Sequence, residues 1–227
     1  MKTKNALASI VIMLILSSGL CFDSIAQENK TSEDIKKMEE NKNMDEKRMQ
    51  EKMMDNKMTM PGMADVASWP MSSQMALKEQ MALYGKPTEM TPTMAIWYNN
   101  GPWKKTVISK MESKHDFPKS HMDCMMQCVS FKVPTDMYDE LGKFDGSVTV
   151  DRTQGLLAAR CDKEENNFLA LNLAYDVIMK KKTVDEARRA YGEMIMMAMK
   201  GSKPEYMKKL MFDSNTNAAD SDMNTIK

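Results

Sequence analysis

The chain has 227 residues, with 32 basic and 32 acidic side chains, 42% hydrophobic residues and 28 methionines. This length accommodates one ordinary domain with additional segments, or at most two small domains. A net charge of zero argues against a nucleic-acid binder, and the lack of any stretch of about 20 apolar residues argues against a multi-pass membrane protein.

Residues 1–26 have the three parts of a secretory signal peptide. Lys2 and Lys4 supply the positive start, an uncharged apolar run covers residues 6–20, and small residues precede a cleavage point after Ala26. We therefore expect a periplasmic or secreted protein with no transmembrane segment once the signal is removed.

Two alternatives to simple export remain open. The apolar run could act as an uncleaved membrane anchor, although it ends early and no charged stop follows it. Cys21 could instead carry a lipid, but Leu20 is large where a lipid-attachment sequence has a small residue. Cleavage would leave three cysteines, Cys124, Cys128 and Cys161, so a disulfide from Cys161 to either of the others leaves one thiol over.

Residues 27–66 differ in composition from the rest of the chain. Eight basic and eight acidic side chains alternate irregularly between Lys30 and Lys57, and Ile35 is the only apolar residue there that is not methionine. Because charged residues interrupt every helical face, this arm is expected to be flexible or partly helical, without a core of its own.

A globular domain is expected over residues 67–212. It starts with a helix at 71–84 and continues with strands at 94–98 and 103–110. Asn99-Asn100-Gly101 tolerates positive φ and joins the two strands as a hairpin.

The middle of the domain is expected to contain a strand, a helix and a second hairpin. Residues 128–133 alternate as a strand, and residues 136–144 read as a short helix. Strands at 147–151 and 156–161 flank Thr153-Gln154-Gly155.

The end of the domain is expected to be helical, at residues 165–181, at 183–200 and in a short helix from Pro204 to near Phe212. Thr183 and Glu186 form a capping box at the start of the second helix. Residues 213–227 are expected to be a disordered tail. Antiparallel hairpins followed by helices indicate the α+β class.

Three blocks carry a resemblance to a known group of proteins: Trp97-Tyr98-Asn99-Asn100-Gly101-Pro102-Trp103-Lys104, the pair Phe144-Asp145-Gly146-Ser147 and Asp151-Arg152-Thr153, and Phe168-Leu169-Ala170-Leu171-Asn172-Leu173-Ala174. The chain resembles, over about residues 69–212, an uncharacterised family of exported bacterial proteins of unknown function. This resemblance implies secretion and transfers no catalytic residue, and it does not extend to the thiols of Cys124 and Cys128.

The methionines of the arm are the first candidate metal ligands. A thioether is neutral and polarisable, so it can bind a soft ion such as Cu(I) without losing a proton. The candidate ligands in the arm are Met49, Met53, Met54, Met58, Met60 and Met63. The competing interpretations are a partner-binding helix, a general compositional excess and sacrificial oxidation. If the methionines reflect a general compositional excess, those of the folded part should pack in or near the core. These are Met194, Met196, Met197 and Met199.

A second candidate metal site lies between His115 and Cys128. This segment contains both histidines of the chain, together with thiols and thioethers, which are ligands of copper and zinc sites. The candidate ligands are His115, His121, Met122, Cys124, Met125 and Cys128. A helix at 124–128 would stack the two sulfurs on one face, whereas the spacing lacks the Cys-x-x-Cys pattern of zinc sites.

An enzyme would have to use the same residues. Cys124 could act as a nucleophile with His115 or His121 as base and Asp116 or Asp123 as the orienting group, but the spacing does not require these groups to meet. The leading hypothesis is an exported, non-enzymatic protein that binds soft metal ions, most simply Cu(I), as a buffer or carrier. The alternative is an envelope interaction domain with an unknown protein partner and no metal role.

Overall fold

The computed structural model describes residue 44 and residues 63–214, 217–220 and 222–226. The expected signal peptide and almost all of the Met-rich arm lie outside these residues. The chain divides into two units, Met1–Met58 and Thr59–Lys227. The helices and strands given below lie in the second unit, which is called the folded body. No helix within the described parts of the chain is long and apolar enough to cross a membrane.

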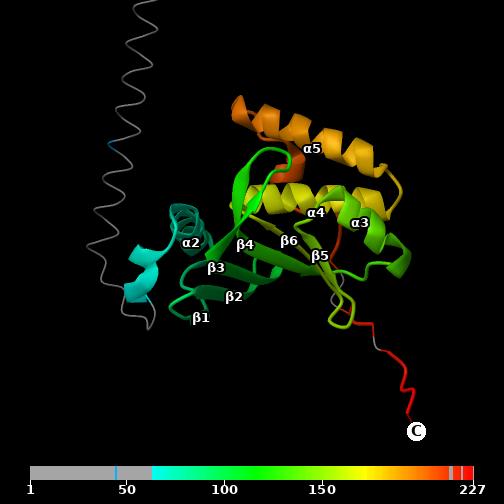
Figure 1. Cartoon of the computed structure of the whole chain (residues 1–227), viewed down its shortest axis with the longest axis horizontal. Helices are drawn as coiled ribbons and strands as arrows, with labels where there is room; N and C mark the ends of the chain where they lie inside the picture. The colour runs from blue at the N-terminus through cyan, green and yellow to red at the C-terminus, as the bar shows by residue number, and fades with distance from the viewer. Residues whose placement is uncertain (1–43, 45–62, 215–216, 221, 227) are drawn as a thin grey trace, which may run out of the picture. The chain divides into compact units, whose positions relative to one another are not determined.

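A six-stranded antiparallel sheet forms the centre of the folded body (Figure 1). The strand order is β1-β2-β3-β4-β6-β5, so β4 pairs with β6, and β5 lies at the edge. The strands are β1 Glu89–Met90, β2 Met94–Asn100, β3 Trp103–His115, β4 His121–Ser130, β5 Val148–Asp151 and β6 Leu156–Cys161.

Helices precede, interrupt and follow the strands, which confirms the predicted α+β class and its helical C-terminal end. Among them, α3 and α5 pack against each other and against α4. The helical elements are η1 Met63–Ser68, α2 Met71–Tyr84, η2 Thr135–Met137, α3 Tyr138–Phe144, α4 Glu164–Ile178, α5 Val184–Met199 and η3 Glu205–Met207.

Local signals placed several elements correctly. Asn99 and Gly101 adopt φ angles of 51° and 59° in the turn between β2 and β3, as their residue types allow. The Glu186 amide donates a hydrogen bond to the Thr183 hydroxyl, and the Thr183 amide donates one to the Glu186 carboxylate. The predicted capping box is therefore present.

The predicted strand at 128–133 is wrong in its bounds, because β4 covers His121–Ser130 and β3 extends to His115. The helix considered for residues 124–128 is likewise wrong. These residues lie within a central strand that pairs with β3 on one side and β6 on the other. Long-range pairing stabilises this extended conformation where the local sequence shows no alternation.

The C-terminal segment is less helical than predicted, because only Glu205–Met207 form a 3-10 turn. The rest of it crosses α4, where Asn172 Nδ2 donates to the carbonyls of Tyr206 and Lys209 at 2.9 and 2.8 Å. The Met211 amide donates to Asn172 Oδ1 at 2.7 Å. These bonds replace the hydrogen bonds of a helix. Farther on, Ala218 is buried.

A single side chain shows that α2 and α4 cover the same face of the sheet. Gln127 of β4 donates to Gln80 of α2 at 3.2 Å, and its own carbonyl accepts from Asn167 of α4 at 2.9 Å. The apolar residues around these contacts form the core, in which Leu77 of α2 and Leu171 of α4 are almost fully buried.

A buried carboxylate joins α4 to this face of the sheet. Oε1 of Glu164 accepts hydrogen bonds from Tyr84 Oη at 2.7 Å, from Gln127 Nε2 at 3.3 Å and from Trp103 Nε1. The three donors come from α2, β4 and β3. Trp103 also stacks on Phe168 of α4, with ring centroids 4.7 Å apart. This network connects four elements through one side chain.

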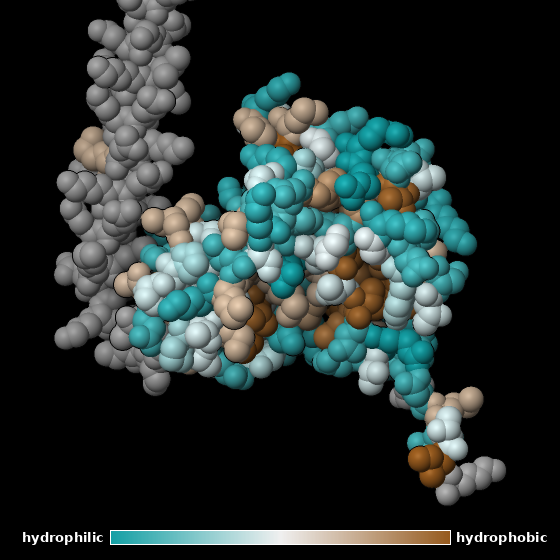
Figure 2. Space-filling view, in the orientation of Figure 1, coloured by the Kyte–Doolittle hydropathy of each residue, from teal (hydrophilic) through white to brown (hydrophobic). Residues whose placement is uncertain are grey.

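The methionines of α5 are not the core filling that composition suggested. Met196, Met197 and Met199 are 56%, 47% and 67% exposed, and only Met194 packs against the core from a half-buried position. The reason is that α5 lies outside α4, so only Ala187 and Tyr191 of this helix are buried. The face seen in Figure 2 is largely hydrophilic, with separate hydrophobic patches.

The hairpin of β3 and β4 contains an irregularity that sets its far end apart from the sheet. Ile108 pairs with Met125, whereas the next regular pair is Ser113 with Asp123, so β3 advances five positions while β4 advances two. Such bulges bend a strand and increase its twist. In Figure 1 the end of the hairpin rises from the sheet toward α5.

Candidate metal centre

The two histidines meet at the end of the β3–β4 hairpin. His115 is the last residue of β3 and His121 the first of β4, and the two are paired across the strands. Partners in an antiparallel ladder project on the same side. The ring centroids are accordingly 5.1 Å apart.

Aromatic packing holds the hairpin end against the helices. The Phe117 ring meets Tyr191 of α5 edge-on at 5.1 Å and Phe144 of α3 at 6.4 Å. The Arg188 guanidinium lies 3.9 Å from the centre of the Phe117 ring. The position of both histidines therefore depends on contacts far from them in sequence.

A buried carboxylate completes a group of three potential ligands. His115, His121 and Asp123 each offer an atom within 4.8 Å of the others. Nε2 of His121 lies 3.1 Å from Oδ1 of Asp123, and Nδ1 of His115 lies 3.4 Å from Oδ2. The Asp123 side chain is 1% exposed, so both contacts are shielded from water.

The second nitrogen of each imidazole has its own partner. Nδ1 of His121 lies 2.9 Å from the carbonyl oxygen of Lys119, and Nε2 of His115 lies 3.6 Å from Oδ1 of Asp145. Backbone carbonyls and carboxylates in these positions orient metal-ligating histidines and raise their basicity. Ser147 supports the group by donating its hydroxyl to Oδ2 of Asp123.

The electrostatics of the group favour positive charge. Interaction with Asp123, followed by the contact with Cys161, raises the pKa of His121 to about 11. Burial raises the pKa of Asp145. A metal ion would replace the proton that His121 otherwise keeps, because a ligating imidazole must be neutral.

Only two of the six predicted ligands between His115 and Cys128 come together. Met122 is half-buried and lies between His121 and Asp123 in β4. Because adjacent strand residues project to opposite faces, its side chain points away from these two. Cys124 and Met125 pack in the cluster under α2. Cys128 lies four positions beyond Cys124, which is about 13 Å along a strand.

The predicted ligands of the arm cannot be placed. Met49, Met53, Met54, Met58 and Met60 lie outside the described residues, and for Met63 only its place at the start of η1 is described.

Asp123 was not predicted as a ligand, although the sequence contains a signal that could have identified it. Once β4 is recognised as a strand, the alternation His121-Met122-Asp123 puts the imidazole and the carboxylate on one face. Cys161, Asp145 and Ser147 had no such signal, because they approach through the pairing of β6 with β4 and the loop before β5.

All three thiols of the folded body are free and buried. Burial raises the pKa of Cys124 to about 12 and also raises the pKa values of Cys128 and Cys161. Cys124 contacts Ser73 of α2 and not either histidine. The nucleophile considered from the sequence therefore lacks its base and its thiolate.

We expect slow alkylation of these thiols in the folded protein. Iodoacetamide near pH 8 should modify Cys124, Cys128 and Cys161 at least about tenfold more slowly than in urea, because buried thiols with raised pKa values present little thiolate. Mass spectrometry of quenched time points gives each rate separately. Rapid labelling of Cys124 alone would contradict this expectation and revive the nucleophile hypothesis.

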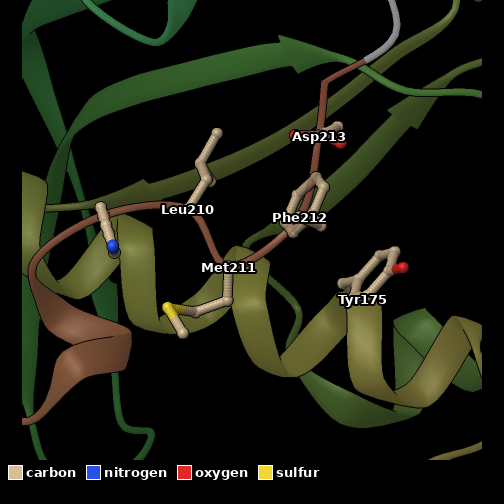
Figure 3. A pocket seen from close by; sticks show the side chains of 6 residues that line it. Tyr175, Leu210, Met211, Phe212 and Asp213 are labelled. Atoms are coloured by element: carbon tan, nitrogen blue, oxygen red, sulfur yellow. The ribbon is translucent and has the colours of Figure 1, made fainter.

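A pocket elsewhere in the folded body carries no comparable chemistry. It lies where the C-terminal segment crosses α4, and Figure 3 shows Phe212 and Tyr175 among the side chains that line it. The rings of these two residues are stacked, with centroids 4.6 Å apart. Its remaining lining is Lys209, Leu210, Met211 and Asp213. One ammonium and one carboxylate do not form a ligand set or a catalytic group.

Comparisons with known proteins add no assignment. No protein family model matches the chain, and neither the curated proteins nor the solved structures contain a match.

Proposed function

We propose that this protein is an exported, non-enzymatic copper-binding protein that serves as a buffer or carrier. His115, His121 and Asp123 hold Cu(II) at the end of the β3–β4 hairpin. The thioethers of the arm hold Cu(I). The support for a periplasmic or extracellular location is the resemblance of residues 1–26 to a secretory signal.

One observation carries the proposal for the folded site. Each histidine directs one ring nitrogen at Asp123, while its other nitrogen lies near a carbonyl or carboxylate oxygen. This arrangement is typical of histidines that ligate a metal, because the outer contact fixes the ring and its tautomer. The buried carboxylate between them supplies negative charge for a cation.

Copper fits this ligand set better than the other common ions. Imidazole and carboxylate groups bind divalent first-row metals, and their affinity rises through the series to Cu(II) and falls again at Zn(II). Calcium and magnesium prefer sites made of oxygen atoms. Zinc should therefore bind the same site more weakly than Cu(II).

The arm contributes the ligands for the reduced ion. Six methionines lie between residues 49 and 63, and thioethers bind Cu(I) at any pH. Two ligand types in one chain allow it to hold copper in either oxidation state. The support for this part of the proposal is the sequence alone.

Competition titrations test the folded site directly. The chain from Gln27 onward should bind one Cu(II) against a chelator of known affinity, and His115→Ala or His121→Ala should each weaken binding by more than about tenfold, since losing a ligand exceeds the loss of an outer contact. Asp116→Asn is a matched control because this exposed carboxylate lies on the same hairpin and pairs with Lys114.

The outcome against the proposal is equally clear. If the double variant of both histidines binds Cu(II) as tightly as the unchanged chain, the folded site does not hold copper. A parallel titration with Cu(I) should weaken when the six arm methionines are changed to leucine. An unchanged Cu(I) affinity would remove the arm from the proposal.

A further inference from the structure

One serine connects the two carboxylates of the candidate metal centre. The Ser147 hydroxyl donates to Oδ2 of Asp123, and the Ser147 amide donates to Oδ1 of Asp145 at 2.8 Å. Both carboxylates lie close to His115, Asp123 at 3.4 Å from Nδ1 and Asp145 at 3.6 Å from Nε2. The Ser147 hydroxyl oxygen itself lies 3.3 Å from Nδ1 of His115.

The backbone holds Ser147 in place independently of any ion. The Ser147 carbonyl accepts the Arg160 amide at 3.1 Å, next to the point where β5 begins to pair with β6. Its amide is held by Asp145, and the residue is buried. The hydroxyl is therefore directed at Asp123 by the fold, as an outer contact of a metal site must be if it is to orient a ligand.

The two oxygens of Asp123 have different surroundings. Oδ2 accepts the Ser147 hydrogen bond and also lies 3.4 Å from Nδ1 of His115 and 4.0 Å from Nε of Arg160. Oδ1 is buried and has no hydrogen-bond partner in the described part of the chain, although Nε2 of His121 is 3.1 Å away. A buried acceptor without a partner carries a desolvation cost, which a bound cation would offset. Two atoms that bind one ion at about 2.0–2.2 Å lie roughly 3 Å apart when adjacent, and the spacing of Nε2 and Oδ1 matches this.

We infer that Ser147 determines the metal preference of the centre, by holding Oδ2 of Asp123 in a hydrogen bond so that Oδ1 alone binds the ion. This inference rests on the proposed function, and Ser147 is a positioning residue that does not touch the ion. Manganese, magnesium and calcium prefer sites made of oxygen ligands, whereas two imidazoles and one carboxylate oxygen suit copper. Engaging the second oxygen limits the oxygen ligands of the centre and favours Cu(II) over Mn(II).

The ratio of the Cu(II) affinity to the Mn(II) affinity tests this role. Ser147→Ala removes the hydroxyl but keeps the amide that holds Asp145. The Cu(II) affinity should fall by at least about tenfold, as for the loss of other outer contacts. The Mn(II) affinity should stay equal or rise because Oδ2 becomes free to bind, so the ratio should also fall by at least about tenfold. A serine with a merely structural role would lower both affinities in proportion and leave their ratio unchanged.

Ser73 provides a matched control. It is fully buried as well, and its hydroxyl donates to the carbonyl of Ser109 at 2.7 Å, between α2 and β3. Ser73→Ala removes the same kind of buried hydrogen bond without touching Asp123 or either histidine. This variant should leave the affinity ratio unchanged, and urea unfolding of both variants would measure any loss of stability separately.

X-ray absorption spectroscopy of the unchanged chain loaded with Cu(II) gives a second readout, because the carboxyl carbon lies closer to the ion when both oxygens bind. We expect binding through one oxygen. Binding through two oxygens, or an unchanged affinity ratio in Ser147→Ala, would refute the role of Ser147 and leave the proposed function standing. If the unchanged chain binds no Cu(II), both proposals fail. The spectrum of the unchanged chain decides even where Ser147→Ala does not fold.

Discussion

Replacing Glu164 with alanine should destabilise the folded body by about 3 kcal/mol or more, because each buried donor left without an acceptor costs about 1–3 kcal/mol. Three donors would lose their common acceptor: Tyr84 Oη, Trp103 Nε1 and Gln127 Nε2. Unpaired polar groups in the interior retain their full desolvation cost. Urea unfolding followed by tryptophan fluorescence would measure the change in free energy of unfolding.

The neighbouring glutamate is a suitable control for this prediction. Glu165 is at the same helix terminus but is only half-buried, and it pairs with Lys203 on the surface. Exposed ion pairs contribute about 0–1 kcal/mol, so Glu165→Ala should have a small effect. Glu164→Gln, which keeps an acceptor oxygen, should fall between the two. Equal effects of Glu164→Ala and Glu165→Ala would show that the buried network does not stabilise the fold.

Replacing Phe117 with alanine should weaken Cu(II) binding by about tenfold although all the ligands remain, a loss comparable to that of an outer contact. The Phe117 ring fixes the hairpin end by packing on Tyr191 and Phe144 and beneath Arg188. Without it, His115 and His121 would have to be ordered by the metal itself, and this ordering costs conformational entropy. Chelator competition would measure the loss.

Phe131 provides the comparison for a general loss of stability. This half-buried ring packs edge-on against Tyr175 and Phe212, away from the hairpin end. Phe131→Ala should lower the free energy of unfolding to a similar degree and leave copper affinity unchanged. The proposed positioning role of Phe117 would be refuted if both variants bound copper equally well.

The features of the fold that sequence reasoning found are those encoded by neighbouring residues. The Thr183–Glu186 capping box, the turn at Asn99–Gly101 and the helix α2 all have short-range signals that the structure confirms. The first half of β4 was missed because its extended form depends on pairing with β3 and β6. Local propensity does not contain such contacts.

The candidate site could likewise be predicted only where the signal lies in residues close in sequence. Both histidines could be selected because imidazoles are rare in this chain and have few structural roles. Cys124 and Cys128 were selected for their closeness in sequence, yet the thiol near His121 is Cys161. Strand order determines which cysteine approaches, and several orders are compatible with the same set of predicted hairpins.

The offset between Ile108 and Ser113 has a consequence for how the protein tolerates changes in chain length. These residues face the same way although an odd number of positions separates them, because their partners Met125 and Asp123 are two apart. An irregular segment of this kind takes up a difference in residue number without changing the faces of the residues that flank it. Deleting or inserting one residue at 109–112 therefore leaves the pairing of Ser113, Lys114 and His115 with β4 intact. The histidine pair should tolerate single-residue indels at these positions.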